Sequence, residues 1–240
     1  MRLINWNIER RGPHTWQAAS LVSEIGSLVP DLVVLTEAHT TSLDTLGGHI
    51  LSHRGYNRGP KADSEQLVVI WSRTPWTYIP LPESLADLGG AVLGRTRVEG
   101  RDVHCLGLCI PWHMAPDSPP RDKVRPWRRH EMFLEQLGPA LQALDGLRPL
   151  IVAGDFNRRM PRSWGPHSSY EKLEAAMTGF DIVTRGSLPP LDAMTIDHVA
   201  ISGALSPTDV RALDRRDASG KARSDHFGVL VDFEWHAGPG

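Results

Sequence analysis

Strong net charge, long apolar runs and pairable cysteines are all missing from this 240-residue chain. The net charge of −2 argues against broad coating of nucleic acid or of an anionic membrane, although a local basic patch stays compatible with it. No apolar stretch approaches the roughly 20 residues that a membrane helix needs. The N-terminal residues carry one basic residue and then a polar, strand-like pattern. We therefore expect no signal peptide and, by default, a cytoplasmic location.

The two cysteines, Cys105 and Cys109, lie in one predicted strand. Four strand residues span roughly 13 Å, which is too far for a disulfide, so we expect two reduced core thiols. The remaining composition, 40% hydrophobic and 22% charged, is that of an ordinary globular protein. With no repeat and no linker-like segment, we expect a single domain over residues 1–240.

Hydrophobic patterning predicts more strands than helices along the chain. Strands are expected over residues 3–8, 31–35, 66–72, 91–98, 103–110, 150–153, 197–202, 208–213 and 228–233. Helices are expected over residues 15–29, 122–143 and 170–177. Because several strands in the middle of the chain follow one another directly, we expect antiparallel pairing there.

Gly154, Asp155, Phe156 and Asn157 follow an apolar run, 149–153, that reads as a buried strand. The glycine permits a close turn at the strand end. In extended backbone Asp155 and Asn157 share one face while Phe156 turns inward. A carboxylate beside an amide can accept a proton or hold a metal, and can donate to an oxyanion. The alternative is an Asx turn, in which Asp155 caps the backbone.

Polar side chains recur where other predicted strands begin or end. They are Asn5, Asn7, Glu37, Asp197, Asp225 and His226. Carboxylates gathered at one sheet edge repel one another unless a cation neutralises them, and oxygen ligands favour a hard cation such as Mg²⁺. An imidazole beside them supplies acid–base or electrostatic help. Together these groups suit metal-assisted attack of water on phosphorus.

With these residues, the chain resembles the endonuclease/exonuclease/phosphatase superfamily, which includes exonuclease III-like and DNase I-like nucleases. The matching motifs are Trp6-Asn7-Ile8, Thr36-Glu37, Gly154-Asp155-Phe156-Asn157, Ile196-Asp197-His198 and Ser224-Asp225-His226-Phe227. They occur in the family's order and span nearly the whole chain. The resemblance implies an α/β (α+β) fold of the DNase I-like type: a four-layer α-β-β-α sandwich of two mixed β-sheets with outer helices, and a site at one edge.

The same resemblance implies a Mg²⁺ (or Mn²⁺) site. Glu37 resembles the main metal ligand, with Asn7 beside it on the metal or the phosphate. Asp225 is expected near the metal or a second metal position.

Catalytic roles also follow from the resemblance. Asp155 is expected to orient or deprotonate the attacking water, and Asn157 to donate to a phosphate oxygen. His226 is expected to contact the scissile phosphate and stabilise the charge developing there. Asp197 resembles its orienting partner, which fixes the imidazole tautomer and favours the protonated ring. His198 follows Asp197 in a strand and therefore faces the opposite way, so we expect it to be structural.

The chain departs from the family pattern after the predicted strand 103–110. Cys109 stands where many members have Tyr or His, and Trp112 replaces an Asn. Thr195 stands where a basic residue is common. These changes argue against a standard abasic-site endonuclease, and the family's phosphatase signature after the late strand is also missing.

Two long loops, 111–129 and 158–167, are rich in arginine, tryptophan and proline. Long loops on a compact domain are disproportionately functional. The residues expected to contact substrate are Trp112, His113, Arg158 and Arg159. Solvated or structural roles are the alternative for the loop arginines and tryptophans.

The leading hypothesis is a Mg²⁺- or Mn²⁺-dependent phosphodiesterase or nuclease acting on a phosphate-ester substrate, with nucleic acid as one candidate. A small-molecule or phospholipid-headgroup phosphohydrolase is the runner-up, because the charge is near neutral and no DNA-gripping insertion is evident. A non-catalytic phosphate-binding module is the alternative from another class, motivated by Cys109 at the usual Tyr or His position.

Overall fold

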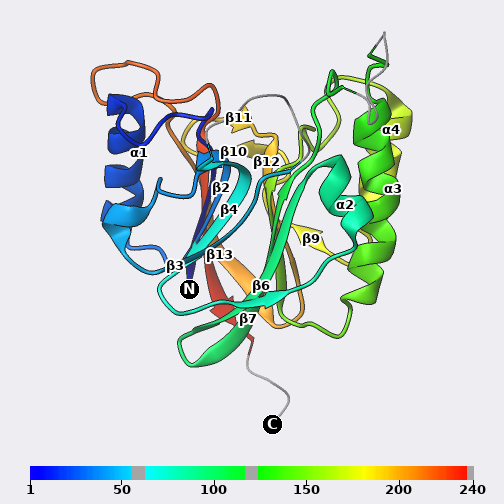
Figure 1. Ribbon diagram of the computed structural model, residues 1–240, viewed down its shortest axis with the longest axis horizontal. Coiled ribbons are helices and arrows are strands. Elements are labelled where there is room, and N and C mark those ends of the chain that lie inside the picture. Colours follow the sequence, from blue (N-terminus) through cyan, green and yellow to red (C-terminus); the bar gives the residue numbers. More distant parts are fainter. Residues whose placement is uncertain (56–62, 117–123, 237–240) are drawn as a thin grey trace.

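Two six-stranded sheets pack face to face in the computed structural model, which describes residues 1–55, 63–116 and 124–236 (Figure 1). The first sheet has the order β13-β14-β1-β2-β4-β3. Its strands are β1 (Arg2–Asn7), β2 (Leu32–His39), β3 (His49–His53), β4 (Glu65–Ser72), β13 (Leu205–Leu213) and β14 (Gly228–Trp235). Only the β1–β2 pair in this sheet is parallel.

The second sheet has the order β5-β6-β7-β8-β12-β9. Its strands are β5 (Thr77–Ile79), β6 (Gly90–Val98), β7 (Arg101–Cys109), β8 (Leu150–Asp155), β9 (Asp181–Ile182) and β12 (Asp197–Ser202). Here only β7 and β8 run parallel. A small ribbon, β10 (Ser187–Leu188) with β11 (Ala193–Met194), lies beside these sheets.

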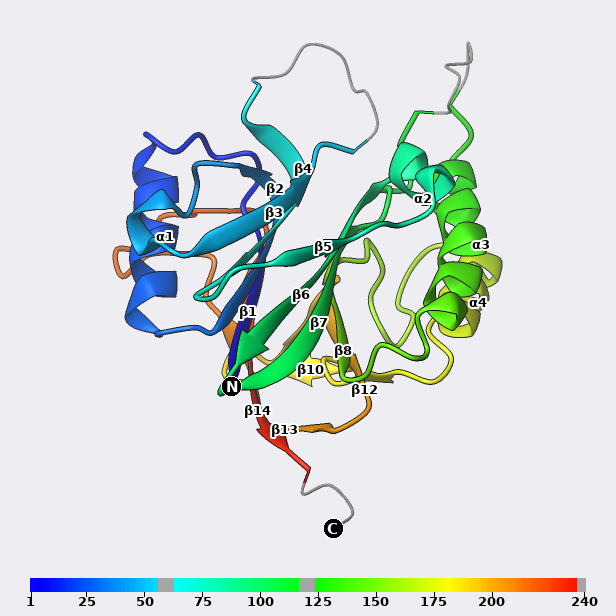
Figure 2. The ribbon, with the colours of Figure 1, turned by 60° about the horizontal axis from the view of Figure 1, so that its bottom comes forward.

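Helices cover the outer face of each sheet, so the layers are helix, sheet, sheet, helix (Figure 2). The helices are α1 (Trp16–Ser27), α2 (Glu83–Leu88), α3 (Arg128–Ala143) and α4 (His167–Ala176), with a 3₁₀ turn, η1 (Asp44–Leu46). Helix α1 covers the first sheet, and α2, α3 and α4 cover the second (Figure 1). The mixed four-layer sandwich expected from the sequence is confirmed.

Three apolar clusters hold the layers together. One lies between the sheets and includes Leu3, Val34 and Val199. The others pack α1 onto the first sheet and α2–α4 onto the second. Cys105 and Cys109 are buried reduced thiols, as expected. Within the described ranges, no helix combines the length and the apolar character that a membrane crossing requires.

Local sequence explains where the helices begin and end. Thr15 caps α1, because its Oγ1 accepts a hydrogen bond from the Ala18 N–H at 3.3 Å. Val29 then takes a left-handed backbone with φ of 52°. Helix α3 begins at Arg128 instead of the expected residue 122, because Trp127 has φ of 69°, which a right-handed helix cannot include. Residues 122–123 lie outside the described residues.

Candidate active site

The sheet register brings two of the expected carboxylates together at one edge of the sandwich. Asp155 ends β8, and Asp197 begins β12 directly opposite it in the antiparallel pair. Gly154 permits this arrangement because its φ is +145° and a Cβ there would lie 1.8 Å from the Leu108 carbonyl oxygen. Across the sheets, the Asn5 Nδ2 atom donates to the Gly154 carbonyl at 3.1 Å.

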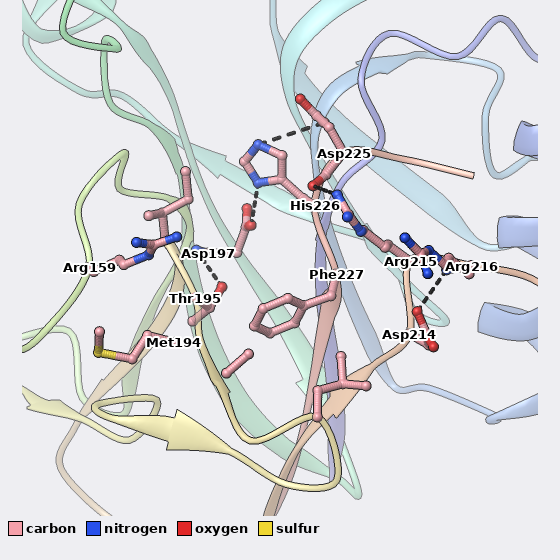
Figure 3. Close-up of a pocket in the computed structure, with 13 residues that line it drawn as sticks. Arg159, Met194, Thr195, Asp197, Asp214, Arg215, Arg216, Asp225, His226 and Phe227 are labelled. Atoms are coloured by element: carbon pink, nitrogen blue, oxygen red, sulfur yellow. Dashed lines mark hydrogen bonds and ion pairs between the residues drawn. The ribbon is translucent and has the colours of Figure 1, made fainter. Parts of the chain in front are cut away.

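Asp197 and His226 form the closest polar pair of the site. The distance from His226 Nδ1 to Asp197 Oδ2 is 2.6 Å, and the Asp197 side chain is only 1% exposed (Figure 3). Burial lowers the pKa of His226, but the Asp197 carboxylate, with help from Asp155 and Asp225, raises it to about 10. The imidazole is therefore cationic at neutral pH, and the Asp197 carboxylate holds its Nδ1 atom.

Asp155 lies in the same group but has a different electrostatic environment. Its Oδ1 accepts the Asn157 backbone N–H at 2.8 Å, and its Oδ2 accepts the Asn7 amide at 3.0 Å. Burial, followed by the Asp197 charge, raises the pKa of Asp155 to about 7, while His226 acts in the opposite direction. Asp155 is thus poised to exchange a proton near neutral pH, which is what a water-activating base requires.

Asn157 does not continue the strand. Its φ of 52° turns the backbone out of extended geometry, and its Nδ2 donates to the Ile110 carbonyl at 2.8 Å. The expectation of a shared strand face with Asp155 is therefore wrong. The Asx turn is present, because Asp155 Oδ1 accepts the Asn157 N–H. Phe156 is fully buried, as expected.

Glu37 lies within β2, two residues before its end, with a left-handed backbone of φ 50°. Its carboxylate contacts Arg10. Arg10 Nη2 lies 2.7 Å from Glu37 Oε1, and Arg10 Nε lies 3.1 Å from Glu65 Oε1. The sequence reading missed Arg10. The only signal was a basic residue three positions after Asn7, which by itself indicates nothing.

Asn7 and Asp225 both form a hydrogen bond with Glu9. The Glu9 N–H donates to Asn7 Oδ1 at 2.9 Å, and Glu9 Oε2 accepts the Asp225 N–H at 3.1 Å. The Asp225 side chain is 61% exposed, and its Oδ1 lies 3.8 Å from His226 Nε2. The structure thus brings Asn7 against Asp155, and Asp225 against His226 on the solvent side.

The donor set fits a hard divalent cation. Candidate ligand atoms of Asp155, Asp197 and His226 lie within 4.8 Å of one another. Within the described part of the chain, the buried Asp197 Oδ1 has no hydrogen-bond partner. Asp155 and Asp197 are buried carboxylates whose charges repel each other, and the Glu37 charge also acts on Asp155, so this edge carries negative charge that a divalent cation would neutralise.

A cavity of about 550 Å³ opens beside Asp197 and His226. Arg159 lies on one side of it and Arg215 and Arg216 on the other, with Phe227 between them (Figure 3). Asp214 and Asp225 also line the cavity, so its wall carries charges of both signs above an apolar floor. The three arginines offer the cations that a phosphorylated organic molecule would need. Arg159 therefore lies where a substrate contact was expected. Arg215 and Arg216 were missed, because a basic pair in an irregular segment resembles any solvated surface.

The expected substrate contact of Arg158 is not supported by its environment. Its side chain is buried, and it donates to the carbonyl oxygens of Trp164 at 2.8 Å and Pro166 at 2.6 Å. The guanidinium therefore holds its own loop together. Trp112 and His113 instead lie in an aromatic cluster with Trp164, outside the cavity.

His198 is structural in its contacts, as expected. It is fully buried, its Nε2 donates to the Arg158 carbonyl at 2.8 Å, and its Nδ1 lies 2.8 Å from the Thr184 hydroxyl. A carbonyl can only accept, so the ring is the Nε2–H tautomer. Burial lowers the pKa of His198 to about 4.

Replacing His198 with glutamine is expected to lower the free energy of unfolding by about 1–3 kcal/mol at pH 7, because buried partners lose their hydrogen bonds. The unfolded chain binds a proton at this residue below pH 6.5, whereas the native state binds it only near pH 4. The free energy of unfolding therefore decreases as the pH is lowered from 6.5 to about 4, by about 1.4 kcal/mol per pH unit. The glutamine variant lacks this loss. The difference in the free energy of unfolding between wild type and variant, measured by urea unfolding, should therefore be smaller at pH 5 than at pH 7. Equal differences at both pH values would contradict the assignment of His198 as a buried, neutral ring.

Residues 4–226 match the model of the Endonuclease/Exonuclease/phosphatase family. The chain belongs to this family. Membership supports phosphoester hydrolysis, and enzymes of the family generally depend on a divalent metal. No curated protein matches the chain at a significant level.

Solved structures of the family show the same fold at low sequence identity. A Bacteroides vulgatus endonuclease/exonuclease/phosphatase has a TM-score of 0.68 at 15% identity, with 98% of each chain covered. The human Nocturnin catalytic domain with bound sulfate has a TM-score of 0.65 at 18% identity, covering 98% of this chain and 93% of its own. D. rerio TDP2 complexed with single-strand DNA product has a TM-score of 0.66 at 14% identity, with 98% of each chain covered.

Proposed function

We propose that this chain is a Mg²⁺- or Mn²⁺-dependent phosphodiesterase or nuclease that hydrolyses a P–O bond by attack of water. The observation that carries the proposal is the arrangement of Asp155, Asp197 and His226 at one sheet edge. It places a carboxylate with a raised pKa beside an imidazolium with a raised pKa. A proton acceptor close to a fixed cation is the pair of groups that hydrolysis of a phosphate ester needs.

Each residue has a distinct role in this proposal. Asp155 accepts the proton of the attacking water, and the cationic His226 donates a hydrogen bond to the phosphate as negative charge develops. Asp197 keeps the imidazole charged and oriented. The Asn157 amide donates one hydrogen to the Ile110 carbonyl and directs its other hydrogen toward the phosphate.

Glu37, Asn7 and Asp225 would hold the divalent cation. When bound, the cation lowers the pKa of coordinated water and neutralises charge on the phosphate. The chain's own residues supply the rest of the chemistry, and Arg10 keeps the Glu37 carboxylate at this edge through its contact at 2.7 Å.

Nucleic acid is the first candidate substrate, and a small phosphorylated molecule is the second. The single-strand DNA product in the D. rerio TDP2 structure supports the first. The cavity of about 550 Å³ between Arg159 and the Arg215–Arg216 pair supports the second, because it has the size of a small-molecule site.

A panel of phosphate esters tests the proposal. Purified protein should hydrolyse bis-p-nitrophenyl phosphate and at least one of single-stranded DNA or RNA with Mg²⁺ or Mn²⁺, and should lose this activity in EDTA. Binding that weakens steeply with salt would favour nucleic acid over a small molecule, because polyanion binding releases counterions. Binding of phosphate esters without turnover under every metal condition would instead support a non-catalytic module.

A further inference from the structure

Three tryptophans and a histidine form an aromatic cluster where β7 and β8 leave the second sheet. His113 lies at the centre, with ring centroids 5.2 Å from Trp112 and 4.9 Å from Trp164. Trp127 lies 5.6 Å from His113 and 5.2 Å from Trp164. We call these four residues the tryptophan platform.

The base of the platform is buried and anchored. Trp127 is 8% exposed, and the Arg158 guanidinium lies 4.4 Å from its ring centroid. The same guanidinium donates to the Trp164 carbonyl. Gly165 completes the packing: its φ is +78°, and a Cβ there would lie 2.1 Å from Arg158 Nη1 and 2.6 Å from the Trp127 ring. The exposed rings therefore rest on a fixed support.

The top of the platform is open to solvent. Trp112 is 42% exposed and Trp164 is 60% exposed, although both contact His113. Single exposed aromatics need no explanation, but two that share a rigid, buried support mark an interaction site. Loop 158–166 adds exposed Arg159 and Arg162 and contains no acidic residue.

The platform is continuous with the active-site edge. The Ile110 N–H donates to the Asp155 carbonyl at 2.9 Å, and the Ile110 carbonyl accepts from Asn157 Nδ2 at 2.8 Å. Trp112 follows two residues later, and the loop that carries Trp164 begins directly after Asn157. A substrate whose phosphate reaches Asp155 can therefore extend along this edge onto the exposed rings.

Resting on the proposed phosphodiesterase function, we propose that Trp112 and Trp164 stack on bases of a single-stranded nucleic acid whose phosphate enters the active site. Indole rings stack on any base because every base has a π face. The bases must be unpaired, because the faces of paired bases are covered by their neighbours in a duplex. Arg159 and Arg162 supply positive charge for the backbone beside the stacked bases.

Binding of a labelled oligothymidylate in EDTA tests this proposal without turnover. An abasic strand of the same length is the matched ligand, because it keeps the backbone charge and lacks the bases. Trp112→Ala and Trp164→Ala should each weaken binding of oligothymidylate by roughly 5- to 100-fold, with little effect on the abasic strand. Trp164→Phe should retain most of the affinity, because a ring remains. Trp16→Ala is the control, since Trp16 is 47% exposed on α1, on the outer face of the other sheet.

Hydrolysis of bis-p-nitrophenyl phosphate separates this proposal from the proposed function. If wild type cleaves that ester but binds both strands equally, or if the alanine variants bind oligothymidylate as wild type does, the platform proposal is overturned and the phosphodiesterase stands. If the ester is not cleaved but base-dependent binding disappears in the alanine variants, the platform stands and the enzymatic proposal fails. Binding of thymidine monophosphate as tightly as the strand would overturn the single-strand assignment.

Discussion

Replacing Asp155 with asparagine is expected to reduce phosphodiester hydrolysis by roughly 100- to 10,000-fold, the range that a positioned general base contributes. The amide is nearly isosteric but cannot accept the proton of the attacking water. In wild type, burial of the Asp155 carboxylate and the nearby Asp197 charge raise the pKa of Asp155 to about 7. At pH 8 and without metal, the unfolding temperature of the variant should therefore equal or exceed that of wild type, because the variant has lost a buried charge that destabilises the fold.

Asp181→Asn is the matched control for this prediction. Asp181 is exposed in β9, pairs with β12 at Ile201, and is therefore remote from the Asp197 end of that strand. Its variant should keep the wild-type rate. Initial rates on bis-p-nitrophenyl phosphate provide the measurement. A fully active Asp155→Asn protein would remove the proton-accepting role from this residue.

Asp197→Asn is expected to lower the pKa of His226 in the metal-free protein from about 10 to below roughly 8, because the closest opposite charge is lost while burial of the ring remains. The sign follows from the charge: a carboxylate favours the imidazolium, and an amide does not. Above the new pKa the ring is neutral and no longer offers a cation to the phosphate. Hydrolysis at pH 8 should therefore fall by roughly 100-fold or more, since orientation and charge are lost together.

NMR titration of the His226 ring in the metal-free protein measures this pKa. Asp225→Asn is the comparison, because Asp225 also faces the ring but lies 3.8 Å away and is 61% exposed. Solvent screens that charge, so its removal should change the pKa of His226 far less. If the two variants titrate alike, or if Asp197→Asn leaves the pKa at its wild-type value, the buried pair does not control the charge of His226.

Ordered motifs made the fold and the residues of the site edge predictable. Strand β12 begins and ends where the apolar pattern predicts, and Asp197 then faces Asp155 because strand register fixes opposite neighbours. The neighbouring residues Trp6 and Asn7 likewise point to opposite faces of β1. Trp6 packs in the apolar cluster between α1 and the first sheet, and Asn7 contacts Asp155. Period-2 patterning is informative for strands such as these because their two faces have different surroundings.

Edge elements and backbone reversals were not predictable in the same way. Strand β3 is partly exposed along its length, so its residues show no clear alternation, and β5 has only three residues. Glu37, Asn157 and Trp127 all have positive φ, which a pattern read as extended or helical cannot reveal. The misplaced start of α3 and the wrong side-chain direction of Asn157 both follow from this property.

The environments of the arginines depend on partners that are distant in the sequence, so the sequence of a loop does not determine them. Arg158 and Arg159 are neighbours in the sequence, yet one is buried against backbone carbonyls and the other lines the cavity. Arg10 reaches Glu37 because the chain turns back onto β2, where the Arg10 N–H donates to the Glu37 carbonyl at 2.7 Å. Composition identifies a basic loop but does not distinguish these environments.

Metal-dependent hydrolysis at this site is tested by the initial rate of bis-p-nitrophenyl phosphate cleavage as Mg²⁺ or Mn²⁺ is returned to EDTA-treated protein. We expect no cleavage without metal, a saturable recovery with one or both cations, and no recovery in the His226→Ala variant prepared in parallel. Cleavage that persists in EDTA, or a His226→Ala protein that recovers as wild type does, would contradict metal-dependent hydrolysis at this site.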